Sequence, residues 1–383
     1  MLRSIVPAVL ATMAVASLLE AQAVPVVSLT KPEAEFAEPF DQVSGVRELS
    51  NGRVVVADLF AKSVAMADFR SGSLTKIGRE GQGPGEYAFP INVLALPGDT
   101  TLIVDPGQRR FVKVAPDGKA VGLVSFPEGA GGMGNMRGTD SQGRVYLQAS
   151  PFGPRLPGEG RLTREMPDSA PILRWNVSSG RIDTLAKVKL PEIASASSGT
   201  ASARSVVMRQ QPFSARDEWA VTPDGRVGIA RISDYHVEWF GSSKVAGPRV
   251  AAPKVPVTQA DKDLIARQQN ETRGRMMVSV GGPPRSSGDA PPPPKLPDAD
   301  FPEFKPAFLG NAFASPDGRL WVPRSQAANT PPVYDVFDAR GNLVQQVKLA
   351  RGTRLVGFGA NSIYTARTDE DELQYLQRHR RPA

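Results

Sequence analysis

One pattern of turn and strand recurs along the chain. A turn rich in Gly, Asn or Asp leads into a short run of apolar, mostly β-branched residues that ends on a polar residue, as in Leu49–Asp58. Short apolar runs bounded by such turn residues are typical of β-hairpins. Further copies of the pattern lie at residues 96–105, 140–147, 222–230, 315–322 and 359–366. The sequence therefore predicts six hairpins.

Most hairpins are followed by a second pair of strands with its own turn. After Asp58, residues 63–69 and 73–77 form two such runs around Ser71-Gly72. Asp58 and its counterpart Asp105 are 47 residues apart, which matches the roughly 40–50 residues of a four-stranded propeller blade. The spacing predicts an all-β fold, a six-bladed β-propeller with four strands in each blade.

The ends of the chain provide a way to close the ring. The last unit has only three strands before residue 378, and Val26–Leu29 is an unattached β run. We expect Val26–Leu29 to add as the outer strand of the sixth blade, because a closed ring leaves no open sheet ends. Deletion of the chain through Leu29 should then destabilise the whole domain. Residues 379–383 are expected to form a solvated basic tail.

The long insertions all fall on one face of the predicted propeller. Residues 148–171, 191–214 and 248–310 each follow a second or a fourth strand, whereas the other connections are tight turns. The 248–310 insertion, between blades 4 and 5, contains a capping pattern at Thr258 that predicts a helix from Gln259 to about Arg273. Its Pro-rich part from Pro283 should be extended or disordered. Insertions on one rim favour a binding face, although loops that are merely tolerated would look similar.

The N-terminus predicts export. Residues 1–23 combine a cationic start, a short apolar run and the small residues Ala21-Gln22-Ala23, as in a secretory signal peptide. The apolar run is shorter than the roughly 20 residues of a membrane-spanning helix. The mature domain, residues 24–378, is expected to be periplasmic or extracellular, monomeric and without a membrane span. Its net charge of +7 comes from scattered residues, so we do not expect nucleic-acid binding.

A glycine-rich segment, Gly81-Gln82-Gly83-Pro84-Gly85-Glu86-Tyr87, follows the first blade. The prolines in and after it block the helix that a phosphate-binding loop requires, so we interpret it as a rigid turn. With this segment the chain resembles the six-bladed propellers of the TolB-like and NHL-repeat type, in particular exported bacterial members. The resemblance covers nearly all of the mature sequence. It implies the fold but not a chemistry, because such propellers include calcium- or zinc-dependent lactonases and lyases as well as binding modules.

Few residues support catalysis. The chain has no cysteine and only two histidines, His236 and His379, which excludes a zinc site of several histidines. A Ser-His-Asp mechanism would depend on His236 alone, which the alternation around it places on an outer strand. No cofactor is expected, although Ca²⁺ remains possible because it needs only oxygen ligands such as Asp58 and Asp105.

Equivalent positions at the ends of the second strands form the predicted site. Arginines fall there on the later blades, and their planar guanidinium groups suit carboxylates and phosphates. An alternative is that these side chains form salt bridges with one another. The candidate binding residues are Asp58, Asp105, Arg231, Asp234, Arg324 and Arg367.

The favoured interpretation is an exported, non-catalytic propeller that binds a small anionic ligand, or a protein or glycan partner, on the loop-rich face around the central channel. The alternative is a lactonase-like, Ca²⁺-dependent hydrolase or lyase that uses the carboxylates of Asp58 and Asp105.

Overall fold

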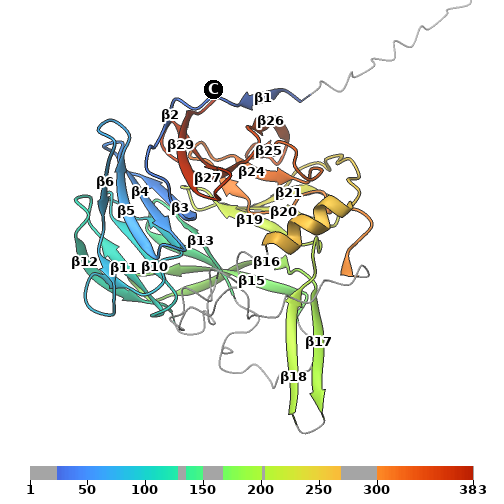
Figure 1. Ribbon diagram of the computed structural model, residues 1–383, viewed down its shortest axis with the longest axis horizontal. Coiled ribbons are helices and arrows are strands. Elements are labelled where there is room, and N and C mark those ends of the chain that lie inside the picture. Colours follow the sequence, from blue (N-terminus) through green and yellow to red (C-terminus); the bar gives the residue numbers. More distant parts are fainter. Residues whose placement is uncertain (1–23, 128–134, 150–166, 201–202, 269–299, 383) are drawn as a thin grey trace, which may run out of the picture.

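The computed structural model describes residues 24–127, 135–149, 167–200, 203–268 and 300–382. They form six sheets, each with four antiparallel strands, arranged as blades around a common axis (Figure 1). The prediction of a six-bladed β-propeller is confirmed. The expected signal peptide, residues 1–23, and most of the Pro-rich segment lie outside the described residues.

Each blade is an up-and-down meander whose first strand lies nearest the axis. Blade 1 consists of β3 (Val43–Glu48), β4 (Val54–Asp58), β5 (Ser63–Asp68) and β6 (Ser73–Lys76). Blade 2 consists of β9 (Asn92–Ala95), β10 (Thr101–Asp105), β11 (Arg110–Val114) and β12 (Ala120–Ser125). Blade 3 consists of β13 (Asn135–Thr139), β14 (Arg144–Gln148), β15 (Ser169–Asn176) and β16 (Ile182–Lys189). Blade 4 consists of β19 (Glu218–Val221), β20 (Val227–Arg231), β21 (His236–Phe240) and β22 (Lys244–Ala246). Blade 5 contains β23 (Phe313–Ala314), β24 (Leu320–Arg324), β25 (Val333–Phe337) and β26 (Leu343–Leu349). Blade 6 consists of β27 (Thr353–Phe358), β28 (Ser362–Thr368), β29 (Gln374–Arg380) and β2 (Ala34–Glu35).

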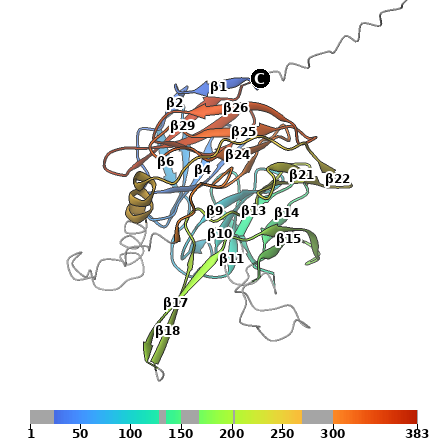
Figure 2. The same ribbon diagram turned by 90° about the vertical axis from the view of Figure 1, so that its right-hand side faces the viewer.

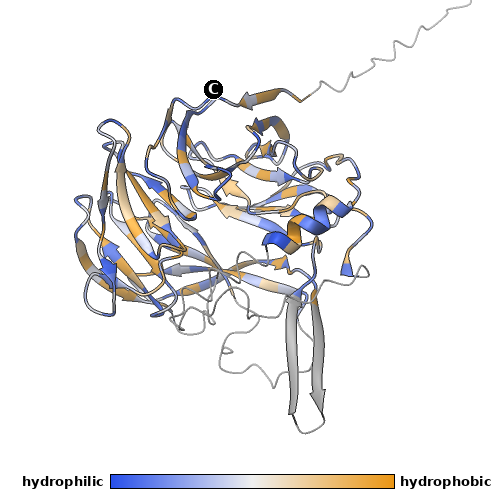
Figure 3. Ribbon diagram, in the orientation of Figure 1, coloured by the Kyte–Doolittle hydropathy of each residue, from blue (hydrophilic) through white to orange (hydrophobic). Residues whose placement is uncertain are grey.

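The core lies between the blades. Each of the six hydrophobic clusters among the described residues joins two neighbouring blades, as where Val55 and Met66 of blade 1 pack with Ile103 and Val112 of blade 2. Figure 3 shows apolar residues along the strands of the blades and hydrophilic residues at many of the turns. A fully buried side chain of this kind contributes about 1.5–3 kcal/mol, so each blade depends on its neighbours for stability.

An N-terminal strand closes blade 6, as predicted, but this strand is Ala34–Glu35 and not the predicted Val26–Leu29. β2 (Ala34–Glu35) pairs with β29 of blade 6, whereas β1 (Val26–Leu29) pairs in parallel with β26 and gives blade 5 a fifth strand. Phe36 and Phe40 explain the difference, because their buried rings enter the core between blades 6 and 1 and fix which segment closes the ring. Deletion through Leu29 therefore removes a strand from blade 5 and leaves the closure in place.

The C-terminal strand is also longer than expected. We placed the start of a basic tail at His379, but β29 continues to Arg380, with His379 paired to Ile363. The His379 side chain is 3% exposed. These residues pair with the beginning of β28, where Ser362 lies opposite Arg380, and this pairing holds them in the sheet in spite of their charge.

The described parts of the insertions follow second or fourth strands, as predicted. Between blades 3 and 4, β17 (Ile193–Thr200) and β18 (Ala203–Gln210) form a hairpin that extends away from the propeller (Figures 1 and 2). Between blades 4 and 5 a helix occupies residues 259–268, and its predicted end near Arg273 lies outside the described residues. At the start of this helix the Asp261 carboxylate accepts hydrogen bonds from the amide and the hydroxyl of Thr258, both at 2.9 Å, as the acid does in a capping box. Within the described ranges, no helix has the length and apolar character needed to cross a membrane.

Glycines bring the innermost strands close together at three blade interfaces. β3, β13 and β27 each contain a β-bulge followed by a glycine, at Gly45, Gly138 and Gly357. A Cβ atom on these glycines would lie 2.1 to 2.6 Å from a side chain of the next blade's first strand. Only a residue without a side chain permits this approach.

The glycine-rich segment lies in the connection between blades 1 and 2, where we predicted a rigid turn. β7 (Arg79–Glu80) and β8 (Glu86–Tyr87) pair in parallel across it. The Glu86 carboxylate accepts a hydrogen bond from the Gly83 amide at 2.8 Å and from Arg79 at 2.7 Å. The Tyr87 hydroxyl donates to the carbonyl oxygen of Ile77 at 2.8 Å. β8 leads into β9 without a helix, which distinguishes the segment from a phosphate-binding loop.

Candidate functional site

The two predicted acidic residues at the strand ends bind the main chain of their own blades. Asp58 and Asp105 are 4% and 0% exposed. The carboxylate of Asp58 accepts hydrogen bonds from the amides of Asp41 and Gln42 at 2.8 and 3.0 Å. That of Asp105 accepts from the amides of Ala88 and Phe89, both at 3.0 Å. Each carboxylate fixes the loop that enters its blade.

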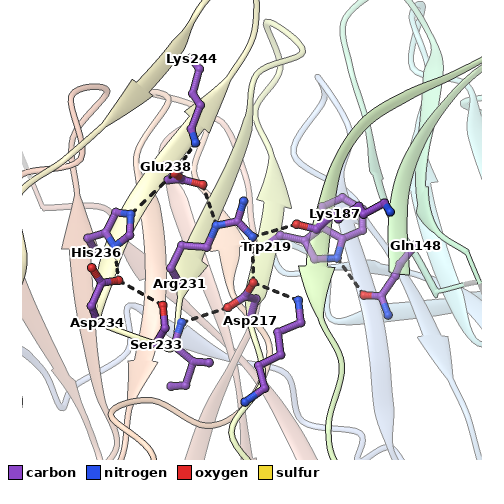
Figure 4. Close-up of polar contacts among 12 residues, drawn as sticks. Gln148, Lys187, Asp217, Trp219, Arg231, Ser233, Asp234, His236, Glu238 and Lys244 are labelled. Atoms are coloured by element: carbon purple, nitrogen blue, oxygen red, sulfur yellow. Dashed lines mark hydrogen bonds and ion pairs between the residues drawn. The ribbon is translucent and has the colours of Figure 1, made fainter. Parts of the chain in front are cut away.

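Arg231 lies in a network on blade 4 (Figure 4). Its guanidinium donates to Glu238 at 2.7 Å, to Asp217 at 2.8 Å and to the Lys187 carbonyl oxygen at 2.8 Å. Burial disfavours the charged form, but the hydrogen bonds to Asp217 and Glu238 prevail and raise the pKa of Arg231. The positive charge of Arg231 is thus compensated within the blade.

Asp234 and His236 belong to the same network. Asp234 accepts from Nδ1 of His236 at 2.6 Å and from Arg249 at 3.0 Å. Burial opposes ionisation of Asp234, but the bonds from Arg249 and His236 lower the pKa of this carboxyl group. The Ser233 hydroxyl contacts the same Asp234 oxygen as the imidazole, at 3.3 Å. Serine and histidine therefore share one acceptor, which is not the arrangement of a Ser-His-Asp relay. His236 is the first residue of the third strand of its blade.

Arg324 and Arg367 each form a two-pronged ion pair. Arg324 Nε lies 3.0 Å from both oxygens of Asp335, a residue with 0% exposure. Arg367 binds both oxygens of Glu35 in the closing strand β2, at 2.9 and 2.7 Å. The hydrogen bond from Arg367 is the main reason that the pKa of Glu35 is lowered.

The six predicted residues do not converge on one site. They lie at the ends of second strands of separate blades, except for Asp234, which lies in the loop after β20. All three predicted arginines are paired with carboxylates of the chain itself. These carboxylates belong to Asp217, Glu238, Asp335 and Glu35, so the salt bridges do not join the candidate residues to one another as the alternative expected.

A cavity of 480 Å³ occupies the central channel. The first strands of the six blades line it, and each of these strands is the end of its sheet and leaves one backbone edge unpaired. Asn92 and Arg354 lie near the loop-rich end of the cavity, where first strands begin. Glu48 and Ala360 lie at the other end, near the tight turns. The volume is within the range of small-molecule sites.

Arg354 is the most unusual charged residue of this lining. Its guanidinium donates to the carbonyl oxygen of Val43 and, at 2.8 Å, to the side-chain oxygen of Gln374. Among the described residues no carboxylate forms an ion pair with Arg354. The arginines at the ends of the second strands, called the rim arginines below, each have such a partner: Arg231, Arg324 and Arg367. Burial lowers the pKa of Arg354. The channel thus contains a cation whose partners are neutral.

Two more arginines line the channel and contact the following blade. Arg47 donates to the Asp99 carbonyl oxygen at 3.0 Å, and its nearest carboxylate oxygen, also of Asp99, is 3.6 Å away. Arg137 forms an ion pair with Glu218 at 3.1 Å. Glu218, buried at the start of β19, is also paired with Arg216 at 2.7 Å. Arg137 therefore has a carboxylate partner, whereas Arg354 has none among the described residues.

Glu48 is a negatively charged residue of the lining at the tight-turn end of the channel. It accepts hydrogen bonds from the Ala360 amide at 3.2 Å and the Tyr364 hydroxyl at 2.5 Å. No ion pair joins it to a described cationic residue. Burial, followed by the contact with Glu48, raises the pKa of Tyr364, which keeps the hydroxyl a donor. Glu48 and Arg354 thus lie at opposite ends of the channel, and Arg47, which also lies at the tight-turn end, has the Asp99 carboxylate 3.6 Å away.

The described residues do not suggest a metal centre. No group of three or more His, Asp or Glu side chains among them is placed to hold a metal ion. Asp58 and Asp105, the predicted Ca²⁺ ligands, already accept hydrogen bonds from main-chain amides. Turning either carboxylate towards a cation would break the loop that it fixes.

The channel residues were not among the predicted site residues, because the prediction rested on the ends of the second strands. Arg354 lies one residue into a first strand, and Arg137 lies at the bulge next to Gly138. An alignment of the first strands would have shown charged residues in segments that otherwise read as apolar. That signal was available in the sequence.

Neither a family model nor a curated protein matches the chain. Solved structures with a similar fold include a gluconolactonase from Xanthomonas campestris, with 13% identity, a TM-score of 0.44 and coverage of 92% of this chain and 97% of that chain. A member of the DUF4221 family from Bacteroides vulgatus has 9% identity, a TM-score of 0.47 and coverage of 92% and 98%. Virginiamycin B lyase from Staphylococcus aureus has 10% identity, a TM-score of 0.41 and coverage of 91% and 96%. These similarities concern the fold alone. The chain's own strand order identifies it as a six-bladed β-propeller.

Proposed function

We propose that this protein is an exported binding propeller that holds a small organic anion at the loop-rich end of its central channel, with Arg354 as the principal contact. The observation that carries the proposal is that Arg354 lines a 480 Å³ cavity and that its partners among the described residues are neutral. A buried charge without a counter-charge is costly. An anionic ligand would supply the missing charge.

The predicted face is retained in this proposal, but the residues change. Arg231, Arg324 and Arg367 have internal carboxylate partners, so an anion would have to displace those carboxylates to bind there. An anion at Arg354 displaces none. No contact of the described residues favours the alternative of a Ca²⁺-dependent hydrolase or lyase that uses Asp58 and Asp105.

Calorimetric titration with citrate, inorganic phosphate and 3-phenylpropionate tests the anion site. At low ionic strength we expect at least one of them to bind the wild-type protein, and Arg354→Met to weaken that binding about tenfold to hundredfold, as for the loss of a hydrogen bond to a charged group. The matched control is Arg367→Met, which removes an equal charge from the rim and should leave the affinity unchanged. Binding that is equal in wild type and Arg354→Met, or no binding of any probe at millimolar concentration, would overturn the proposal.

Export is tested separately by fractionation of cells that express the full chain. We expect the protein in the periplasm or the medium, without residues 1–23, and we expect it to stay in the cytoplasm when these residues are deleted. Cytoplasmic retention of the intact chain would contradict the export part of the proposal alone.

A further inference from the structure

Two opposite charges without ionic partners line the same cavity. Arg354, near the start of β27, reaches the carbonyl oxygen of Val43 at the start of β3. Glu48, at the end of β3, reaches the turn after β27. Both side chains therefore lie along the interface between blades 6 and 1, one at each end of the channel. Neither forms an ion pair with a described residue.

The distance between the two groups explains why they do not neutralise each other. Val43 and Glu48 are the first and last residues of β3, and a strand advances about 3.3 Å per residue, so the two ends are about 16 Å apart. This separation exceeds the Debye length of about 8 Å at physiological ionic strength, so the attraction between the charges is weak. A ligand with a negative group at one end and a positive group at the other would compensate both.

The walls of the channel indicate the chemistry between those ends. β3 and β27 are the inner ends of their sheets and leave unpaired backbone N–H and C=O groups towards the axis. An extended peptide is the ligand whose own backbone matches such an edge. A peptide of four residues spans about 13–14 Å when extended, which is within about 3 Å of the length of β3 between the two ends.

Resting on the proposed function, we infer that the ligand is a short linear peptide of about four residues with both termini free. Its C-terminal carboxylate binds Arg354 at the loop-rich end of the channel, and its α-ammonium group binds Glu48 at the tight-turn end. The inference identifies the anionic group of the proposed function as a peptide carboxylate and adds a second, cationic requirement that small anions do not meet.

Tetra-alanine with free ends, its N-acetyl form, its C-terminal amide and dialanine test the inference by calorimetric titration. We expect wild type to bind free tetra-alanine about tenfold more tightly than either blocked form, and dialanine more weakly than tetra-alanine because it cannot reach both charges. Glu48→Gln should remove the preference for a free amine but retain the preference for a free carboxylate. Arg354→Met should do the reverse. Glu80→Gln, an exposed carboxylate outside the channel, serves as the control and should behave as wild type.

The outcomes distinguish the two proposals. If tetra-alanine does not bind, or if acetylation has no effect on wild type while the small anions still depend on Arg354, the peptide inference is overturned and the anion site stands. If neither peptide nor small anion depends on Arg354, both fail. Urea unfolding of each variant shows whether a lost affinity reflects a lost fold. Binding by a folded Glu48→Gln variant that still discriminates against the acetylated peptide would contradict the role of Glu48.

Discussion

Arg324 on the rim and Arg354 in the channel are the same residue type in two different electrostatic settings. Arg324 binds both oxygens of Asp335, which is fully buried and also accepts from Tyr235 and Gln346. Within the part of the chain that the structure describes, the hydrogen-bond partners of Arg354 are a carbonyl oxygen and an amide oxygen. The rim arginine belongs to a complete internal network, whereas the channel arginine leaves a positive charge without an internal counter-charge.

This difference separates residues that stabilise the fold from residues that can bind a ligand. Removing one member of a buried ion pair leaves the other uncompensated, so rim substitutions should cost stability. Removing a cation that has neutral partners leaves no charge behind, so the same substitution in the channel should cost binding instead. The position of the partner, more than the arginine itself, determines which effect follows.

The largest expected effect is the loss of stability of Arg324→Met. This substitution leaves the carboxylate of Asp335 buried without a cation, which should lower the free energy of unfolding by about 3–5 kcal/mol. Arg354→Met should lower it by less than about 1 kcal/mol, because the lost hydrogen bonds are offset by removal of a desolvated charge. Urea unfolding of both variants measures the contrast.

Asn in place of Asp335 provides a check on that contrast. In the double variant Arg324→Met, Asp335→Asn neither charge remains, so the double variant should be more stable than Arg324→Met alone. Equal losses for Arg324→Met and Arg354→Met would show that the two arginines have the same structural role, and would remove the basis for assigning binding to the channel.

Much of the fold could be predicted from the sequence because its signals are local. Turns such as Asp317-Gly318 and the apolar runs after them lie within a few residues of each other, so six hairpins and their spacing are visible without the structure. Closure was harder, since Val26–Leu29 and Ala34–Glu35 are both able to form strands and only the distant core around Phe36 selects between them.

The site could be predicted only in part, because the availability of a charged group depends on partners far away in the chain. The partner of Arg367 is Glu35, 332 positions earlier, and nothing near Arg367 in sequence indicates it. Conversely, Arg354 has the apolar neighbours Leu355 and Val356 in sequence, and only the ring geometry places it in a cavity. The ends of the second strands were identified correctly from the sequence. Only the structure shows which of the charged side chains at these ends are neutralised by a partner.

His379 is a buried basic residue, and it differs from Arg324 and Arg354 because it can lose its charge. Its ring contacts the Thr365 hydroxyl at 3.0 Å, and burial lowers its pKa below the usual 6.5. The unfolded chain therefore takes up this proton at a higher pH than the native protein. Stability should be fully present above about pH 6.5 and should fall as the pH decreases, by at most about 1.4 kcal/mol per pH unit from this group.

The measurement is urea unfolding of wild type and His379→Gln between neutral and mildly acidic pH. Carboxylates titrate in both proteins, so the difference between the two curves isolates His379. We expect the wild type to lose more stability than the variant as the pH falls through the usual histidine pKa. Parallel curves would show that His379 stays protonated or neutral to the same extent in both states, and that burial does not control its charge.

The smallest expected effect is that of the partly exposed rim pair, Arg367 and Glu35. Their side chains are 35% and 34% exposed, so water and salt screen the attraction and the pair should contribute less than about 1 kcal/mol. A double-mutant cycle with Arg367→Met and Glu35→Gln measures this coupling, which should decrease further in high salt. A coupling well above 1 kcal/mol that resists salt would show that β2 depends on this ion pair to close the ring. The aromatic core around Phe36 would then not be sufficient to determine which N-terminal segment completes blade 6.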